Sequence, residues 1–233
     1  MTQDSLLYRI VNGRTDQILD LFAAGGTAHT PAPDGKPLIL WCSYFGDVTA
    51  VRLLVERGAS LRDLGNDLGL NAACYHGYWR LAQFLMENGA DPEGADPETG
   101  ETLLHSALSK SNSPHYDLVV KVLLQNGADP NRKTIPGRET GAFMRDCRTK
   151  GETPLHRAAA YGTEEAIQML LDAGARVDEK DANGDSPITW ASWHERPGSV
   201  LIKLGYGIHR IRQSQAQGWK SSMAAHLLGE PLP

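Results

Sequence analysis

The sequence predicts an all-α solenoid in which paired antiparallel helices are joined by β-hairpin-like loops. Two observations support this fold class: a unit of 33 residues recurs along the chain, and each unit carries signals that start and stop two short helices. Self-similarity at a period of this length is typical of arrays in which each unit buries its apolar face against its neighbours.

The clearest unit runs from Gly151 to Gly184. Thr153 is placed to cap the first helix, and Pro154 fills the first helical position, where no backbone hydrogen bond is lost. Thr163 is placed to cap the start of the second helix. Gly174 follows its end, where glycine commonly terminates a helix. A turn closes the unit before the same pattern starts again. In the first unit, Thr15 is the corresponding candidate cap of the second helix.

The other units are located by two anchors, the Leu or Ile near the start of the first helix and the Gly that ends the second. These anchors are 19 residues apart in four of the units, and the first anchors are Leu6, Ile39, Leu70, Leu104, Leu155 and Ile188. The intervals between first anchors are 33, 31, 34, 51 and 33 residues, and a longer turn and an extended hairpin account for the 51. Removal of 138–151 would restore the regular spacing.

These anchors, together with the motif Thr153–His156 (TPLH), resemble the ankyrin-repeat family. The resemblance implies one array over residues 1–205 and a structural role for the His of each TPLH position, at His105 and His156, in joining neighbouring hairpins. We expect the units at about 4–34, 35–67, 68–100, 101–151 including the insert, 152–184 and 185–205. The tail, 206–233, is expected to cap the last unit or, alternatively, to fold back into the groove.

Bulk composition is that of an ordinary globular protein, with 41% hydrophobic and 22% charged residues and a net charge of −5. No apolar run approaches the ~18 residues of a transmembrane helix, and the first residues do not resemble a signal peptide. Three cysteines do not suggest a disulfide framework. Cys42 and Cys74 are expected to be buried and Cys147 exposed. We therefore expect a cytoplasmic protein, and the similarity of residues 140–160 to bacterial ankyrin proteins suggests a bacterial origin.

Charge is distributed unevenly along the chain. The stretch Asp91–Glu101 contains five acidic residues and no basic residue, whereas residues 131–151 contain six basic residues and two acidic ones. We interpret these neighbouring hairpins either as solvated loop ends or as a surface that orients a partner of mixed charge. A nucleic-acid partner is not expected, because the basic residues do not form a dedicated binding motif.

The family resemblance further implies that three positions of each first helix face the concave side of the array. Eight of the sixteen aromatic residues fall in these eighteen positions, and Arg157 occupies the same position as the two tryptophans Trp41 and Trp190. Exposed aromatic residues on rigid elements supply much of the energy of recognition, although rings can also pack between repeats. The candidate partner-binding residues on these helices are Trp41, Tyr44, Phe45, Tyr75, His76, Tyr161, Trp190, Trp193 and His194.

The inserted hairpin supplies the remaining candidates, Phe143, Arg145 and Arg148. An apolar tip between charged arms suits a finger that closes over the concave groove, with the arginines meeting acidic groups of the partner. A mobile loop is the alternative.

No catalytic motif and no cluster of metal-ligand residues is present in the sequence, so we expect a binding protein rather than an enzyme, with no cofactor and no metal. The first hypothesis is a protein-interaction module that holds a partner protein or peptide in an aromatic groove, without nucleic acid or membrane. The second is a receptor in which Trp190 and Trp193, with Asp185 and Glu195, enclose a small or methylated-ammonium ligand. A hydrolase using His76 or His194 is a third, less favoured hypothesis.

Overall fold

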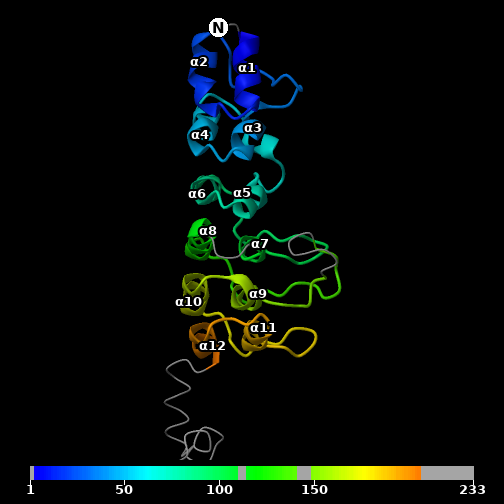
Figure 1. The fold of residues 1–233 in the computed structure, drawn as a ribbon. Coiled ribbons are helices and arrows are strands. Elements are labelled where there is room, and N and C mark those ends of the chain that lie inside the picture. The colour runs from blue at the N-terminus through cyan, green and yellow to red at the C-terminus, as the bar shows by residue number, and fades with distance from the viewer. Residues whose placement is uncertain (1–2, 110–113, 141–147, 206–233) are drawn as a thin grey trace, which may run out of the picture.

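A computed structural model describes residues 3–109, 114–140 and 148–205. Over these residues the chain forms a stack of helix pairs (Figure 1). The pairs are α1 (Gln3–Val11) with α2 (Ile18–Ala23), α3 (Leu38–Tyr44) with α4 (Val48–Glu56), α5 (Leu70–His76) with α6 (Trp79–Glu87), α7 (Leu103–Ala107) with α8 (Pro114–Gln125), α9 (Pro154–Tyr161) with α10 (Glu164–Asp172), and α11 (Pro187–Trp193) with α12 (Gly198–Gly205). Single 3-10 turns lie at Thr15–Gln17 and Leu61–Leu64.

The first helices of the pairs lie in one column and the second helices in another, and the hairpin loops project from the side of the first column (Figure 1). The described residues contain isolated antiparallel bridges in these loops rather than named strands. The prediction of an all-α solenoid with hairpin-like loops is therefore confirmed.

Small side chains allow the first helices to approach one another. The residues Cys42, Ala73, Ala107, Ala158 and Ala191 share one position in successive units, and each is at most 1% exposed. Arg9 occupies the same position in the first unit and is exposed. Among the described residues, no helix pair stacks on this side of the first unit, and the charged side chain is in contact with water.

Histidine side chains join the first helix of one unit to the backbone of the next hairpin. The Thr153 amide donates to His156 Nδ1 at 3.2 Å, so the proton of this imidazole lies on Nε2, which is 3.1 Å from the Asp185 carbonyl oxygen. His105 makes the equivalent contacts with Thr102 and with the Glu152 carbonyl oxygen. Burial, followed by the charge of Arg157, lowers the pKa of His105 to about 3, so this imidazole is neutral.

The extended hairpin is more closely integrated into the stack than the repeat spacing predicts. Thr149 is only 3% exposed, and its carbonyl oxygen accepts a hydrogen bond from Gly137 at 2.7 Å. The Gly151 amide donates to Thr134 Oγ1 at 3.1 Å, and the Ala182 amide of the next hairpin donates to the Lys150 carbonyl oxygen at 2.7 Å. Residues 149–151 therefore belong to the fold and cannot be removed with the rest of the insert.

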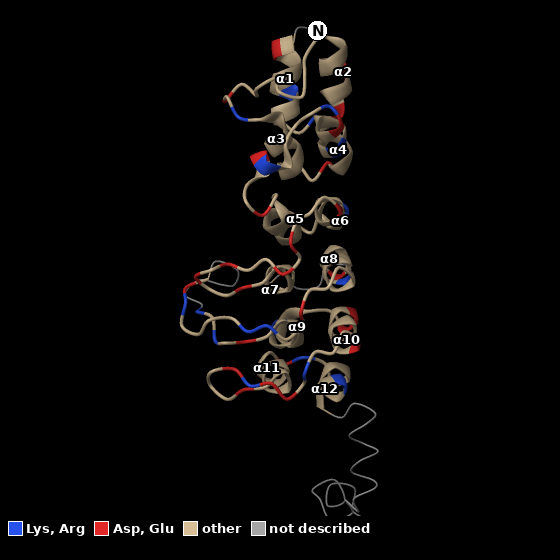
Figure 2. Ribbon diagram, turned by 180° about the vertical axis from the view of Figure 1, so that it is seen from behind, with Lys and Arg blue, Asp and Glu red and all other residues tan. Residues whose placement is uncertain are grey.

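The acidic hairpin and the basic hairpin lie side by side and contact each other directly (Figure 2). Arg132 Nη1 lies 3.4 Å from Glu93 Oε2, and the Ile135 amide donates to the Thr99 carbonyl oxygen at 2.7 Å. Lys133 pairs with Glu179 of the following hairpin at 2.7 Å. Part of the uneven charge in the sequence is thus compensated between successive units of the chain.

Several predictions fall on residues outside those described: the finger residues Phe143 and Arg145, the thiol of Cys147, and the tail 206–233. Cys42 and Cys74 are buried free thiols. Across the described ranges, no helix is long and apolar enough to cross a bilayer.

Candidate functional site

Five predicted site residues gather on α3 and α5 and the residue that follows α3. We call Trp41, Tyr44, Phe45, Tyr75 and His76 the N-terminal aromatic patch. Neighbouring rings meet edge to face, with centroid separations of 5.1 Å for Tyr44 and Phe45 and 5.2 Å for Tyr75 and His76. Tyr44 links the two helices, because its ring also lies 6.4 Å from that of His76. The patch is accessible, since Tyr44 is 62% exposed.

The backbone beneath this patch is anchored from the second helices. Tyr78 donates its hydroxyl to the Tyr44 carbonyl oxygen at 3.3 Å, and Tyr116 donates to the Tyr75 carbonyl oxygen at 3.1 Å. Tyr78 also stacks on His76 with a centroid separation of 5.6 Å. Because Tyr78 and Tyr116 belong to the following units, the exposed rings rest on a cross-linked and therefore well-ordered backbone.

The remaining helical candidates surround a pocket at the other end of the stack. We call this the C-terminal pocket; it has a volume of about 280 Å³ and is lined by Arg148, Lys150, Glu152, Tyr161, Asp185, Trp190, Trp193 and His194. The Tyr161 and His194 rings lie 4.6 Å apart, and the Tyr161 oxygen is 3.3 Å from His194 Nε2. Trp193 is 77% exposed at the rim.

Trp190 is held in a defined orientation within this pocket. Its indole N–H donates to Asp181 Oδ2 at 3.0 Å, and its ring meets that of His156 edge to face at 5.4 Å. The Lys150 ammonium group lies 5.3 Å from the centroid of the same indole, within the range of a cation–π contact. Partial burial lowers the pKa of His194, and the charges of Lys150 and Arg196 lower it further.

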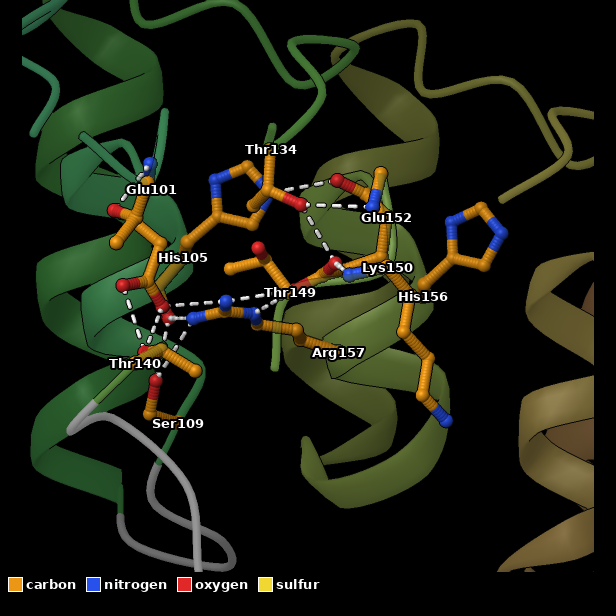
Figure 3. Close-up of polar contacts among 12 residues, drawn as sticks. Glu101, His105, Ser109, Thr134, Thr140, Thr149, Lys150, Glu152, His156 and Arg157 are labelled. Atoms are coloured by element: carbon orange, nitrogen blue, oxygen red, sulfur yellow. Dashed lines mark hydrogen bonds and ion pairs between the residues drawn. The ribbon is translucent and has the colours of Figure 1, made fainter. Parts of the chain in front are cut away.

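A buried ionic cluster shares Glu152 with the lining of this pocket (Figure 3). The Arg157 side chain is fully buried, and its guanidinium group pairs with Glu101 at 2.5 Å and with Glu152 at 2.7 Å. It also donates to the His105 carbonyl oxygen at 3.1 Å and to Ser109 Oγ at 3.2 Å. The assignment of Arg157 to an exposed concave position is therefore wrong, because its side chain extends between the units instead of into solvent.

Glu152 connects this cluster to the wall of the pocket. It is 1% exposed, and its carboxylate accepts hydrogen bonds from Thr134 Oγ1 at 2.6 Å and from the Lys150 amide at 2.7 Å. Burial alone would raise the pKa of Glu152, but Arg157 and these hydrogen bonds outweigh it and lower the pKa to about 2. On the other side, both Glu101 carboxylate oxygens lie 2.8 Å from the hydroxyl of Thr140, at the base of the extended hairpin.

The structure brings the predicted residues together in two groups rather than in one continuous surface. Between the groups, the corresponding positions of α7 and the turn that follows it carry the small, half-buried side chains of Ser106 and Ser109. Sequence reasoning did not include Lys150 among the site residues. Its proximity to Trp190 depends on how the hairpin before α9 packs against α11, and no local sequence pattern predicts that contact.

Known proteins were compared with the chain. Models of ankyrin repeats match residues 39–134, 111–171 and 155–204. A putative palmitoyltransferase ZDHHC13 of Danio rerio is 28% identical over 228 residues, which cover 88% of this chain and 35% of the relative. Rabankyrin-5 of Homo sapiens is 38% identical over 104 residues, or 45% of this chain and 8% of the relative. The serine/threonine-protein kinase TNNI3K of Mus musculus is 35% identical over 144 residues, which cover 57% of this chain and 16% of the relative.

The chain thus spans about a third of the length of the first of these relatives and less of the other two. The match to ZDHHC13 lies mainly in its ankyrin region. Ankyrin repeats indicate a protein–protein interaction module. Residues 39–204 of this chain, which the two sets of matches cover without a gap, belong to the ankyrin-repeat family.

Proposed function

We propose that the chain binds a partner protein or peptide along the face of the first helices, with the N-terminal aromatic patch and the C-terminal pocket as its two contact regions. The observation that carries this proposal is the exposure of three rings at one repeated position. Tyr44, Tyr75 and Trp193 are 62%, 37% and 77% exposed although each stands on, or at the end of, a packed helix. Large rings held on rigid elements bury much area at little entropic cost, which is typical of recognition surfaces.

The spacing of the two regions constrains the shape of the partner. With the small side chains of Ser106 and Ser109, the described part of α7 and the turn after it present no protruding ring at these positions. A partner that contacts both regions must therefore span at least this unit, as an extended segment or a broad domain face does. In this proposal Phe143 and Arg145 of the insert close over the bound partner, and Arg148 meets an acidic group at the pocket.

We also propose that the chain binds without catalysing a reaction. The two buried histidines, His105 and His156, use their ring nitrogens in hydrogen bonds that join successive units. The relatives with enzyme names are matched over at most about a third of their length, and we propose that these matches reflect the repeat array alone. A cytoplasmic location, without nucleic-acid or membrane partners, is part of the same proposal.

A small-ligand receptor is the second candidate, favoured by the existence of the C-terminal pocket with its two tryptophans. The position of Lys150 argues against a methylated-ammonium ligand, because its own ammonium group already lies over the Trp190 ring. A ligand cation would have to displace it or bind beside a like charge. Calorimetric titration with trimethyllysine separates the candidates, since millimolar or tighter binding that Trp190→Ala abolishes would favour the receptor.

The proposal is tested by affinity capture from a lysate of the source organism, with quantification of each captured protein on four baits. Besides the wild type, these are Tyr44→Ala, Trp193→Ala and the control Ile202→Ala. Ile202 is 58% exposed on α12, the second helix of the last unit. Its substitution therefore removes an exposed apolar side chain that lies outside the proposed binding face. We expect one or more proteins to be captured by the wild type and the control and to be depleted on both aromatic variants. Equal capture on all four baits would contradict the proposal.

A further inference from the structure

We infer that the C-terminal pocket receives an acidic side chain of the partner, an Asp or Glu carboxylate within a segment that also carries apolar residues. This inference rests on the proposed function and specifies the chemistry of one of its two contact regions. It follows from the charges that line the pocket, from the way in which its acidic groups are already engaged, and from the apolar walls around them.

The pocket contains two cationic side chains from the extended hairpin, Arg148 and Lys150. The Lys150 ammonium group lies over the Trp190 ring, and among the described residues it forms no ion pair. Arg148 pairs with Glu139 at 3.3 Å, but the two side chains are 64% and 86% exposed. Exposed pairs of this kind contribute ~0–1 kcal/mol, so a partner carboxylate can replace Glu139 at little cost.

The acidic groups of the lining do not cancel these cations. Glu152 is buried, and its carboxylate is paired with Arg157, which it shares with Glu101, and accepts hydrogen bonds from Thr134 and the Lys150 amide. Asp185 is the other carboxylate of the lining, against the two cations, and the lowered pKa of His194 leaves its imidazole neutral. The exposed cations of the pocket, Arg148 and Lys150, thus outnumber its one accessible carboxylate, and an anionic group of a ligand would offset their charge.

The walls of the pocket make a carboxylate on an apolar segment a better match than a free inorganic anion. Trp190 is half buried, and Trp193 extends from the rim with 77% of its surface exposed. These rings offer apolar area to the methylene groups and neighbours of an acidic residue. A bound segment that packs on these rings would exclude water from the pocket, and a charge pair is stronger where the local dielectric constant is lower.

The test uses a random heptapeptide library displayed on phage and selected against the full chain. Peptides that are enriched are synthesised, and their affinities are measured by fluorescence anisotropy. The variants are Lys150→Gln, the matched control Lys180→Gln, Trp193→Ala and Tyr44→Ala. Lys180 is an exposed lysine of the next hairpin that does not line the pocket, so it controls for the change in net charge. The Lys150 side chain is not the part that bonds to Glu152, so its substitution leaves that contact in place.

We expect the enriched peptides to contain Asp or Glu next to an aromatic or aliphatic residue. Lys150→Gln should weaken binding roughly tenfold, as loss of a partly desolvated charge contact does, and Lys180→Gln less than about twofold. A Glu→Gln change in the peptide should cause the same loss on the wild type but little additional loss on Lys150→Gln, because the two groups act as a pair.

Two results would overturn the inference: enrichment of neutral or basic peptides, or acidic peptides whose affinity is the same for the wild type and Lys150→Gln. If such peptides lose affinity on Tyr44→Ala, the proposed interaction surface stands and only the chemistry assigned to the pocket is wrong. If no peptide is enriched, or none depends on Tyr44 or Trp193, the proposed function falls together with the inference.

Discussion

Replacement of Arg157 by methionine would test the buried cluster that connects two successive hairpins. The substitution removes a fully buried guanidinium group that donates twice to Glu152 Oε1, at 3.0 and 2.7 Å, and once to Glu101 Oε1 at 2.5 Å. Glu152, itself 1% exposed, would keep its hydrogen bonds from Thr134 and the Lys150 amide but lose its compensating charge.

The expected effect is large because the remaining carboxylate cannot reach water. Removing one partner of a buried ion pair destabilises proteins by about 3–5 kcal/mol, since an uncompensated charge stays in the interior. We expect Arg157→Met to lower the free energy of unfolding by this amount in urea titrations followed by circular dichroism. Unfolding of a repeat array reports mainly on its weakest interface, so the loss should appear as early melting of the units around α7 and α9.

The double variant Arg157→Met/Glu152→Gln separates charge from packing. A neutral Gln retains a carbonyl oxygen that can accept from Thr134 and Lys150, so much of the lost stability should return. A change below about 0.5 kcal/mol for Arg157→Met alone would be typical of a surface substitution and would refute the buried cluster. Equal losses in the single and double variants would show that packing, and not charge, dominates.

Three further predictions concern the core. Leu155 is 0% exposed, so Leu155→Ala should lower the free energy of unfolding by ~2–5 kcal/mol in the same titration; an unchanged midpoint would contradict its place in the core. Burial raises the pKa of the Cys42 and Cys74 thiols to about 12, so both should react with maleimide far more slowly in the folded than in the urea-unfolded protein, and equal rates would contradict their burial. The pKa values of His105 and Glu152 are lower in the folded than in the unfolded chain, so the unfolded chain takes up protons first as the pH falls. The free energy of unfolding should therefore decrease from about pH 6.5 toward pH 3, and a urea midpoint independent of pH over this range would contradict both shifts.

Local signals in the sequence were sufficient to predict the helix pairs. Thr163 accepts a hydrogen bond from the Ala166 amide at 2.9 Å, as expected of a cap, because the cap requires only residues three positions apart. Thr15 behaves differently: it lies within the 3-10 turn and donates to Asp47 of the next unit at 2.7 Å. That contact depends on the stacking of units and competes with the local role that the sequence predicts.

The same distinction applies to the candidate site. The family resemblance implies that Tyr44, Tyr75 and Trp193 face one side of the array, and each of the three side chains is exposed. The fate of Arg157 could not be predicted from its position, because its burial depends on Glu101 of the preceding hairpin, 56 residues away. The pairing of Lys150 with Trp190 likewise depends on contacts between units rather than on periodicity.

The central claim, that a partner binds along the first-helix face, is tested most directly by hydroxyl-radical footprinting of the complex with the captured partner. The aromatic rings of Tyr44, Tyr75 and Trp193 should lose labelling when the partner binds, whereas Leu19 and Ile202, which are 59% and 58% exposed on second helices, should be labelled as in the free protein. Unchanged labelling of the three rings together with protection of Leu19 or Ile202 would place the contact on the second-helix face and contradict this account.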